Sequence, residues 1–178
     1  RPPYPIDTGY LDKPTIVNNV ETFYDIALIF ELGNEYFNKF GTKDSRGLKL
    51  FSVSGDLEAE GVYVIPYGTT LQELVEMTRA KNIYAIVVGG AQGEIIKKDD
   101  FNKILAFEAL PSGGSIILLN KNRDLLTVLQ NFLEFFVEES CGQCTPCREG
   151  TGWLYRVIHR IEHGLGRPED VDLLTSVG

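Results

Sequence analysis

All three cysteines of this 178-residue chain lie within one short stretch, at Cys141, Cys144 and Cys147. Their spacing is C-x2-C-x2-C. Thiolates are soft ligands, and three of them at three-residue spacing can converge on one metal centre. A disulfide framework does not fit, because an odd number of cysteines in a tight cluster is not the pattern of a secreted framework. The stretch therefore predicts a metal-binding loop.

The spacing favours an iron–sulfur cluster over other metals. A single zinc ion takes four ligands, usually as two separated pairs, whereas a cubane offers several iron atoms to a tight run of cysteines. The first three cysteines of a bacterial ferredoxin run have the same spacing. The fourth of that run would fall on Thr151, so the fourth ligand must come from elsewhere. Two alternatives remain open, namely a zinc site completed by His159 or His163, and three free or structural thiols.

Composition and charge exclude several classes of function. The formal net charge is −8 and the pI is about 4.8, which argues against nucleic acid as a partner because phosphates need a basic footprint. The acidic balance equally disfavours an anionic membrane surface. No apolar run approaches the length of about 18 residues that crosses a bilayer. We therefore expect no nucleic-acid binding and no direct membrane insertion, and the cysteine usage fits a reducing, cytosol-like compartment.

The two ends of the sequence suggest a fragment of a longer polypeptide. The chain opens on Arg1-Pro2-Pro3, without an initiator methionine and without the basic-then-apolar start of a signal peptide. A predicted helix stops abruptly at Gly178. We therefore expect further chain on both sides and no signal peptide.

The N-terminal region predicts an irregular, proline-rich lead-in followed by two helices. The first helix is expected over 18–32, with Asn18 as N-cap and Glu21 completing a capping box. The second is expected over 35–40. The tandem Asn18-Asn19 at a helix start has a second interpretation as a phosphate site, because orphan N–H groups and the positive dipole end attract anions. Periodicity alone favours plain capping.

The middle of the chain has the periodicity of strands around one helix. Thr69 or Thr70 is expected to cap a helix over 71–78. The predicted strands cover 48–54, 62–65, 83–88, 95–96 and 115–120. Strand, hairpin turn, strand, helix, strand is the order of a β-grasp domain, which predicts an α+β fold class and by itself says little about function.

The C-terminal region predicts the start of an α-helical bundle. Asp124 is expected to cap a helix that ends just before the first cysteine, a second helix is expected over 148–163, and a third begins at Pro168. The third helix has no further partner in the sequence. His159 and His163 lie at i, i+4 spacing, which can bind a metal, but they lie opposite the apolar stripe and are expected to face solvent.

Four residues around the cysteines can tune a bound cluster. The hydroxyls of Ser140 and Thr145 can donate hydrogen bonds to sulfur, Gly142 lets the backbone approach closely, and Arg148 can offset negative charge. The chain holds no recognisable acid–base pair, activated nucleophile or oxyanion device. We therefore expect no catalytic residue and a role in one-electron transfer.

Two motifs resemble one protein family. The sequence ESCGQCTPCREG at 139–150 is similar to the iron–sulfur signature E-S-C-G-x-C-x-P-C-R-x-G. This signature is typical of the NADH-binding flavoprotein subunit of NADH:quinone oxidoreductase (complex I) and of related subunits of NAD-reducing hydrogenases and NAD-dependent formate dehydrogenases. KPTIVNNVETF at 13–23 resembles the same family's K-P-T-x-V-N-N-V-E-T. The middle, with Val53-Ser54-Gly55 and Gly61-Val62-Tyr63, resembles its soluble-ligand-binding β-grasp (SLBB) domain.

The resemblance implies a specific set of cofactors. In this family NADH gives a hydride to FMN, and electrons leave singly through a 4Fe-4S cluster towards quinone. Cys141, Cys144 and Cys147 match three of the cluster's four ligands, and the fourth is expected beyond Gly178. The segment that approaches the FMN phosphate is matched by Asn18, Asn19 and Thr22.

The resemblance also implies domains and partners. Residues 1–44 would be the edge of the flavin domain with a linker helix, 45–121 an SLBB-like domain, and 122–178 a partial helical bundle with the iron–sulfur site. The expected partners are other iron–sulfur subunits, including a 2Fe-2S thioredoxin-like subunit. The expected place is the peripheral arm of a membrane-associated complex, on its cytoplasmic or matrix side.

The fragment alone is expected to be inactive, because the glycine-rich fold that binds flavin and NADH lies upstream in this family. Two alternative functions stay open. One is a subunit of an NAD-coupled hydrogenase or formate dehydrogenase. The other is a ligand-binding module stabilised by zinc.

Overall fold

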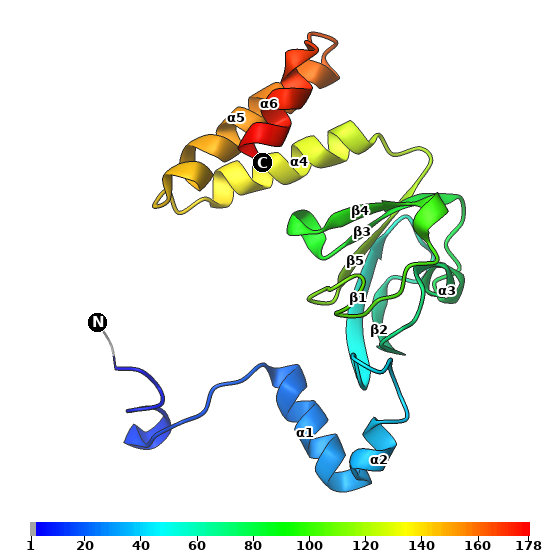
Figure 1. The fold of residues 1–178 in the computed structure, drawn as a ribbon, viewed down its shortest axis with the longest axis vertical. Helices are drawn as coiled ribbons and strands as arrows, with labels where there is room; N and C mark the ends of the chain where they lie inside the picture. The colour runs from blue at the N-terminus through cyan, green and yellow to red at the C-terminus, as the bar shows by residue number, and fades with distance from the viewer. Residues whose placement is uncertain (1–2) are drawn as a thin grey trace.

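The computed structural model describes residues 3–178. Figure 1 shows three parts that follow one another in space in chain order. An N-terminal segment leads into helices α1 (Val20–Leu32) and α2 (Asn34–Phe37), a five-stranded sheet forms the middle, and three helices form the C-terminal part. Across residues 3–178, no helix combines the length and apolar character needed to cross a bilayer.

The sheet is mixed, with strand order β2-β1-β5-β3-β4. Strands β1 and β5 run parallel at its centre, and all the other neighbouring pairs are antiparallel. Helix α3 (Leu71–Met77) connects β2 to β3. The strands are β1 (Leu48–Gly55), β2 (Gly61–Pro66), β3 (Ile83–Val88), β4 (Glu94–Lys97) and β5 (Ser115–Asn120). The predicted order of strand, hairpin, strand, helix and strand is therefore observed.

One face of the sheet carries the main hydrophobic core, which α3 covers. Strand β1 alternates buried and exposed positions, so Phe51 and Val53 point into this core. Leu71 and Leu74 of α3 are fully buried against them. Thr70 and Glu73 form a capping box that starts α3. This core stabilises the sheet, against which α1 and the first of the three C-terminal helices pack.

The opposite face of the sheet is divided between two helices. Helix α4 (Leu125–Glu139) packs on the β3–β5 side, where it covers Ala85, Val87 and Leu119. The β1–β2 side faces α1 instead. Asp56, at the end of β1, binds Arg123 at 2.8 Å and the Asn120 N–H at 3.0 Å. These contacts tie the start of α4 to the sheet.

The C-terminal part contains α4, α5 (Thr145–Glu162) and α6 (Glu169–Val177). Val157 and Ile158 of α5 are buried. Arg160 of α5 forms an ion pair with Asp170 of α6, which is only 3 % exposed. The three helices therefore form one packed unit that carries the cysteine loop between α4 and α5 (Figure 1).

The structure corrects several sequence expectations at helix starts. Helix α1 begins at Val20, and Asn19 rather than Asn18 is its N-cap. Glu21 does not complete a capping box, because its carboxylate binds β1 instead. Helix α5 begins at Thr145, three residues before the predicted start, because the backbone is already helical from the residue after Cys144.

The apolar stripe expected on the second C-terminal helix is only partly buried. Trp153 is 51 % exposed and Leu165 is 69 % exposed. Periodicity identifies the side of a helix that is apolar, whereas the neighbours within the folded chain decide how much of that side is covered.

Candidate metal centre

The three cysteines lie where α4 ends and α5 begins. Cys141 follows the end of α4, Cys144 is the N-cap of α5, and Cys147 lies in the first turn of α5. All three side chains are exposed and free of disulfides. Within residues 3–178, no three His, Cys, Asp or Glu side chains are gathered closely enough to hold a metal ion. The structure thus brings the cysteines to one loop without converging their sulfur atoms.

Ser140 and Gly142 shape this loop. The Gly142 N–H donates to Ser140 Oγ at 3.2 Å, and the same Oγ lies 3.4 Å from Cys147 Sγ. Gly142 has φ +71°, a left-handed conformation that glycine adopts without steric cost. The predicted hydroxyl beside a cysteine sulfur is therefore present at Ser140.

Arg148 lies across the loop. Its Nη1 donates to the Gly142 carbonyl at 2.9 Å, and its Nε donates to Glu149 Oε1 at 3.1 Å. The Thr145 hydroxyl accepts a hydrogen bond from Arg148 Nη2 at 3.5 Å. A cation is thus held against the cysteine loop, with part of its charge offset by Glu149.

The donor set fits an iron–sulfur cluster better than zinc. Three cysteine side chains lie around the N-terminus of an 18-residue helix, where the positive dipole end favours the negative charge of a thiolate-bound cluster. His159 and His163 do not complete this site. Both are exposed, and their rings stack on each other at 4.1 Å. His159 is twelve residues beyond Cys147, which corresponds to about 18 Å along the helix axis.

The second candidate site lies at the N-terminal end of α1. Asn18, Asn19 and Thr22 are all exposed there. Asn19 Oδ1 accepts a hydrogen bond from the Glu21 N–H at 2.8 Å. This bond caps the helix and leaves the side-chain amide of Asn19 as a donor. The two candidate sites lie at different ends of the sheet, because α1 rests on β1 and α4 packs on β3 and β5.

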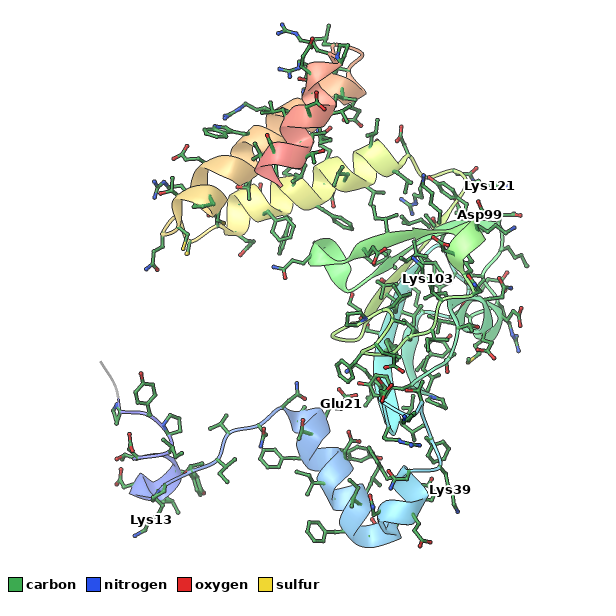
Figure 2. The ribbon with its side chains drawn as sticks, viewed as in Figure 1. Lys13, Glu21, Lys39, Asp99, Lys103 and Lys121 are labelled. Carbon is green, nitrogen blue, oxygen red and sulfur yellow. The ribbon has the colours of Figure 1, made fainter. Side chains whose placement is uncertain are left out.

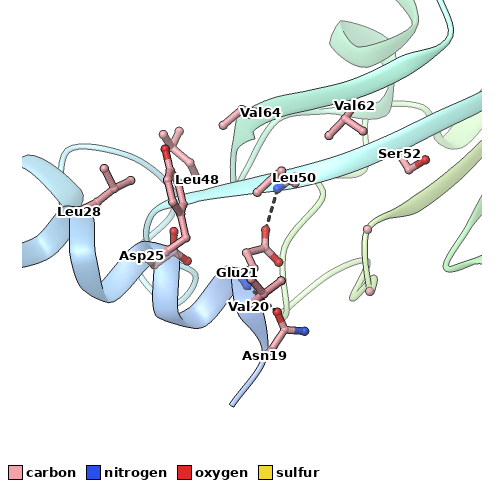
Figure 3. Close-up of a pocket in the computed structure, with 13 residues that line it drawn as sticks. Asn19, Val20, Glu21, Asp25, Leu28, Leu48, Leu50, Ser52, Val62 and Val64 are labelled. Atoms are coloured by element: carbon pink, nitrogen blue, oxygen red, sulfur yellow. Dashed lines mark hydrogen bonds between the residues drawn. The ribbon is translucent and has the colours of Figure 1, made fainter. Parts of the chain in front are cut away.

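A pocket of about 640 Å³ separates α1 from β1 and β2 (Figure 3). Its walls are mostly apolar, with Leu48, Leu50 and Val64 from the sheet. Glu21 and Asp25 add two carboxylates from α1. Glu21 lies where α1 approaches the sheet (Figure 2), and neither the sequence motif nor periodicity predicted that it would contact β1.

The pKa values of the two carboxyl groups in the pocket are shifted in opposite directions. Burial alone would raise the pKa of Glu21, but hydrogen bonds from the Leu50 N–H and from Lys49, together with the charge of Lys49, lower that pKa below its ordinary value. Burial raises the pKa of Asp25, and the negative charge of Glu21 raises it further.

Comparison with known proteins identifies the C-terminal part. Residues 127–178 match the NADH-ubiquinone oxidoreductase-F iron-sulfur binding region. This part of the chain is a domain of that family. The match covers the end of the chain, including the cysteine loop and the helices on either side of it.

Relatives resemble the chain over its whole length. The alpha subunit of the NAD-reducing hydrogenase HoxS of Cupriavidus necator is 41 % identical over 100 % of this chain and 30 % of its own length. A subunit of the NADH-quinone oxidoreductase of Mycobacterium tuberculosis is 32 % identical over 99 % of this chain and 42 % of its own length. The chain therefore spans less than half of these relatives.

A solved structure agrees with the fold. The NAD+-reducing [NiFe]-hydrogenase in its H2-reduced state superposes with a TM-score of 0.87 at 40 % identity. The superposition covers 99 % of this chain and 32 % of the hydrogenase chain. The arrangement of helices and sheet described above is thus shared with a chain of a larger redox enzyme.

Proposed function

We propose that this chain is the electron-transfer part of an NADH-oxidising flavoprotein subunit, which passes electrons from FMN through a 4Fe-4S cluster towards quinone. The observation that carries the proposal is the C-x2-C-x2-C loop between α4 and α5, inside the region that matches the iron–sulfur family. The enzyme would be an NADH:quinone oxidoreductase, and this part alone would be inactive.

The chain's own residues would hold and tune the cluster. Cys141, Cys144 and Cys147 would supply three thiolate ligands, with the fourth ligand beyond Gly178. When bound, the 4Fe-4S cluster supplies one-electron transfer. Ser140 supports this assignment because its hydroxyl lies beside the Cys147 sulfur.

The remaining neighbours of the cluster would act through the backbone and through charge. Gly142 would let the backbone approach the cluster closely, since it carries no side chain, while its N–H holds the Ser140 hydroxyl. Arg148 would stabilise the more negative, reduced state, because its guanidinium is held on the loop by the Gly142 carbonyl. Thr145 would help to orient that guanidinium, which lies within 3.5 Å of its hydroxyl.

We further propose that Asn18, Asn19 and Thr22 approach the FMN phosphate in the full-length protein. The exposed N-terminal end of α1 supports this role, because the free N–H groups and the amide of Asn19 are donors suited to an anion. Residues 1–44 would then be the edge of the flavin domain, and NADH and the rest of FMN would bind to other parts of the full-length protein.

The topology of the sheet supports the assignment of residues 45–121 to an SLBB-like β-grasp domain. Its strand order and the central parallel pair of β1 and β5 agree with that fold. Residues 122–178 would be the partial bundle that holds the cluster. The partners would be other iron–sulfur subunits, including a 2Fe-2S thioredoxin-like one, in the peripheral arm of a membrane-associated complex on its cytoplasmic or matrix side.

A second candidate is the corresponding subunit of an NAD-reducing hydrogenase. The hydrogenase relative is 41 % identical, compared with 32–33 % for the quinone oxidoreductase relatives of Mycobacterium and Rhizobium meliloti. Assays of the purified parent complex separate the two candidates. Hydrogen-dependent reduction of NAD+ would establish the hydrogenase, whereas NADH-dependent reduction of quinone without hydrogen uptake would establish the quinone oxidoreductase.

The first experiment on the proposed function is chemical analysis of the anaerobically purified full-length protein. Iron, zinc and acid-labile sulfide are measured, with EPR spectra before and after reduction. Equal amounts of iron and sulfide with a signal in the reduced state support the proposal. One zinc ion without sulfide contradicts it and supports a zinc-stabilised binding module, because a zinc site contains no sulfide.

A further inference from the structure

Glu21 connects α1 to the sheet through both oxygens of its carboxylate. Oε1 accepts a hydrogen bond from the Leu50 N–H at 2.8 Å, and Oε2 lies 2.9 Å from Lys49 Nζ. Figure 3 shows Glu21 reaching from the first turn of α1 to β1, next to the helix cap Asn19. This pair of contacts is called the Glu21 clamp below.

Strand β1 has a vacant backbone position at this point. Its parallel partner β5 pairs with it from Ser52 onward, and the Ser52 N–H donates to the Gly114 carbonyl at 2.7 Å. Backbone N–H groups of a strand point to the same side at every second residue, so the Leu50 N–H points to the same side as that of Ser52. At Leu50 this side lies before the start of β5 at Ser115. The Glu21 carboxylate takes the acceptor position that β5 leaves empty.

Lys49 makes the contact specific for a carboxylate. Its residue exposure is 9 %, which is low for a lysine, so its ammonium group needs a partner. Glu21 is that partner. The Glu21 side chain therefore provides both an acceptor for the Leu50 backbone N–H and a counter-ion for Lys49. A glutamine would provide only the acceptor, and an alanine would provide neither.

We infer that Glu21 is a positioning residue for flavin binding. By holding the first turn of α1 against β1, it orients the adjacent Asn18 and Asn19, so that the sheet sets the position of the segment that meets the phosphate. The inference rests on the proposed FMN role of that segment. Glu21 acts through the sheet and not by touching FMN, because both of its carboxylate oxygens already have partners on β1.

The test measures the Kd for FMN of deflavinated full-length protein. Loss of hydrogen bonds to a charged group predicts that E21A raises this Kd by about ten-fold. E21Q keeps an acceptor for the Leu50 N–H and should fall between wild type and E21A. K49M keeps the apolar stem, removes the counter-ion, and should weaken FMN binding in the same direction.

Two further variants distinguish the possible causes of a change in the Kd for FMN. Glu31 is exposed near the far end of the same helix, so E31Q removes a negative charge without touching the clamp and should leave the Kd unchanged. N18A tests the phosphate segment itself. The phosphorus NMR signal of bound FMN provides a readout that simple loss of stability would not move, and it should shift in E21A and K49M but not in E31Q.

Each outcome has a defined meaning. If N18A weakens FMN binding while E21A and K49M do not, the clamp inference is wrong and the proposed phosphate segment stands. If E21A weakens binding but K49M leaves the Kd and the phosphorus signal unchanged, the Lys49 contact does not position the phosphate segment, and the inference of a clamp with two contacts is wrong. If none of N18A, E21A and K49M changes the Kd, the phosphate role of the segment fails, and the inference fails with it.

Discussion

At the scale of single residues, Arg148 combines two tasks in one side chain. Its guanidinium closes the cysteine loop by donating to the Gly142 carbonyl, and it places a positive charge on this loop. Glu149 pairs with the same guanidinium and offsets part of that charge. Because both side chains are about half exposed, solvent screens the charge further.

The first prediction concerns the potential of the cluster. Arg148→Leu should lower it by tens of millivolts, on the order of 30 mV, because a nearby positive charge favours the more negative reduced state. A redox titration followed by EPR on the full-length protein measures this shift. Arg156→Leu is the matched control, since that arginine is exposed two turns further along α5. An equal shift in both variants would contradict a local effect of Arg148.

At the scale of elements, the link between α5 and α6 depends on a buried carboxylate. Asp170 accepts hydrogen bonds from the Arg160 guanidinium and, at 2.8 Å, from the Arg167 N–H. It thereby caps the turn that leads into α6 and neutralises a cation of α5. The hydrogen bond from Arg160 is the main reason that the pKa of Asp170 lies below its ordinary value.

This lowered pKa predicts a pH dependence. The ionised carboxylate stabilises the folded state above the ordinary carboxyl pKa of about 3.9. That stabilisation is lost as the pH falls through the lower pKa of the folded state. Asp170→Asn should therefore reduce stability at pH 7 and flatten the loss of stability below pH 4.

Denaturant unfolding of the full-length protein tests this expectation when circular dichroism is used to follow it at pH 7 and at a pH below 4. Asp172→Asn is the control, because Asp172 is exposed on the same helix. If Asp170→Asn and Asp172→Asn had the same small effect at pH 7, the link between α5 and α6 would not depend on this carboxylate.

At the scale of the whole molecule, the two candidate sites lie at different ends of the sheet. Helix α1 is held on β1 by Glu21, whereas α4 packs on the side of β3 and β5 and carries the cysteine loop at its far end (Figure 1). The main core, on the other face of the sheet, is continuous from β1 to β5 and includes Phe51 and Leu118. A change at one end is therefore expected to leave the other end intact.

This separation predicts the outcome of Cys144→Ser in the full-length protein. The variant should lose its cluster iron and sulfide, because a thiolate ligand is removed, while NADH still reduces the flavin. Iron analysis and the bleaching of flavin absorbance by NADH measure the two effects. Gln143→Ser is the control, since it changes an exposed neighbour in the same loop. Loss of flavin reduction in Cys144→Ser alone would mean that the cysteines serve another role.

Strong local patterns made most elements predictable from the sequence. The strands Ile83–Val88 and Ser115–Asn120 are apolar runs with the predicted bounds. Asp124 caps α4, and its Oδ1 accepts from the Leu126 N–H as the local pattern suggested. The cysteine loop was equally recognisable, because its three cysteines lie within one short stretch.

Predictions that depended on the contacts of one side chain were less accurate. Glu21 stands three residues after Asn18 and matches a capping box locally, but Lys49 and the unpaired Leu50 N–H offer its carboxylate a better partner. Those groups lie 28 and 29 positions away in the chain. Local spacing carries no information about them.

The sequence by itself determined the chemistry of the chain: the thiolates, their spacing, the acidic charge balance and the order of strands and helices. Each of these depends on residue type and on near neighbours along the chain. The tertiary structure alone decided that Glu21 holds α1 on β1 and that Arg148 lies across the cysteine loop. It also decided which apolar residues remain exposed. These features depend on burial and on backbone groups left unpaired when the sheet forms, and such groups exist only in the folded chain.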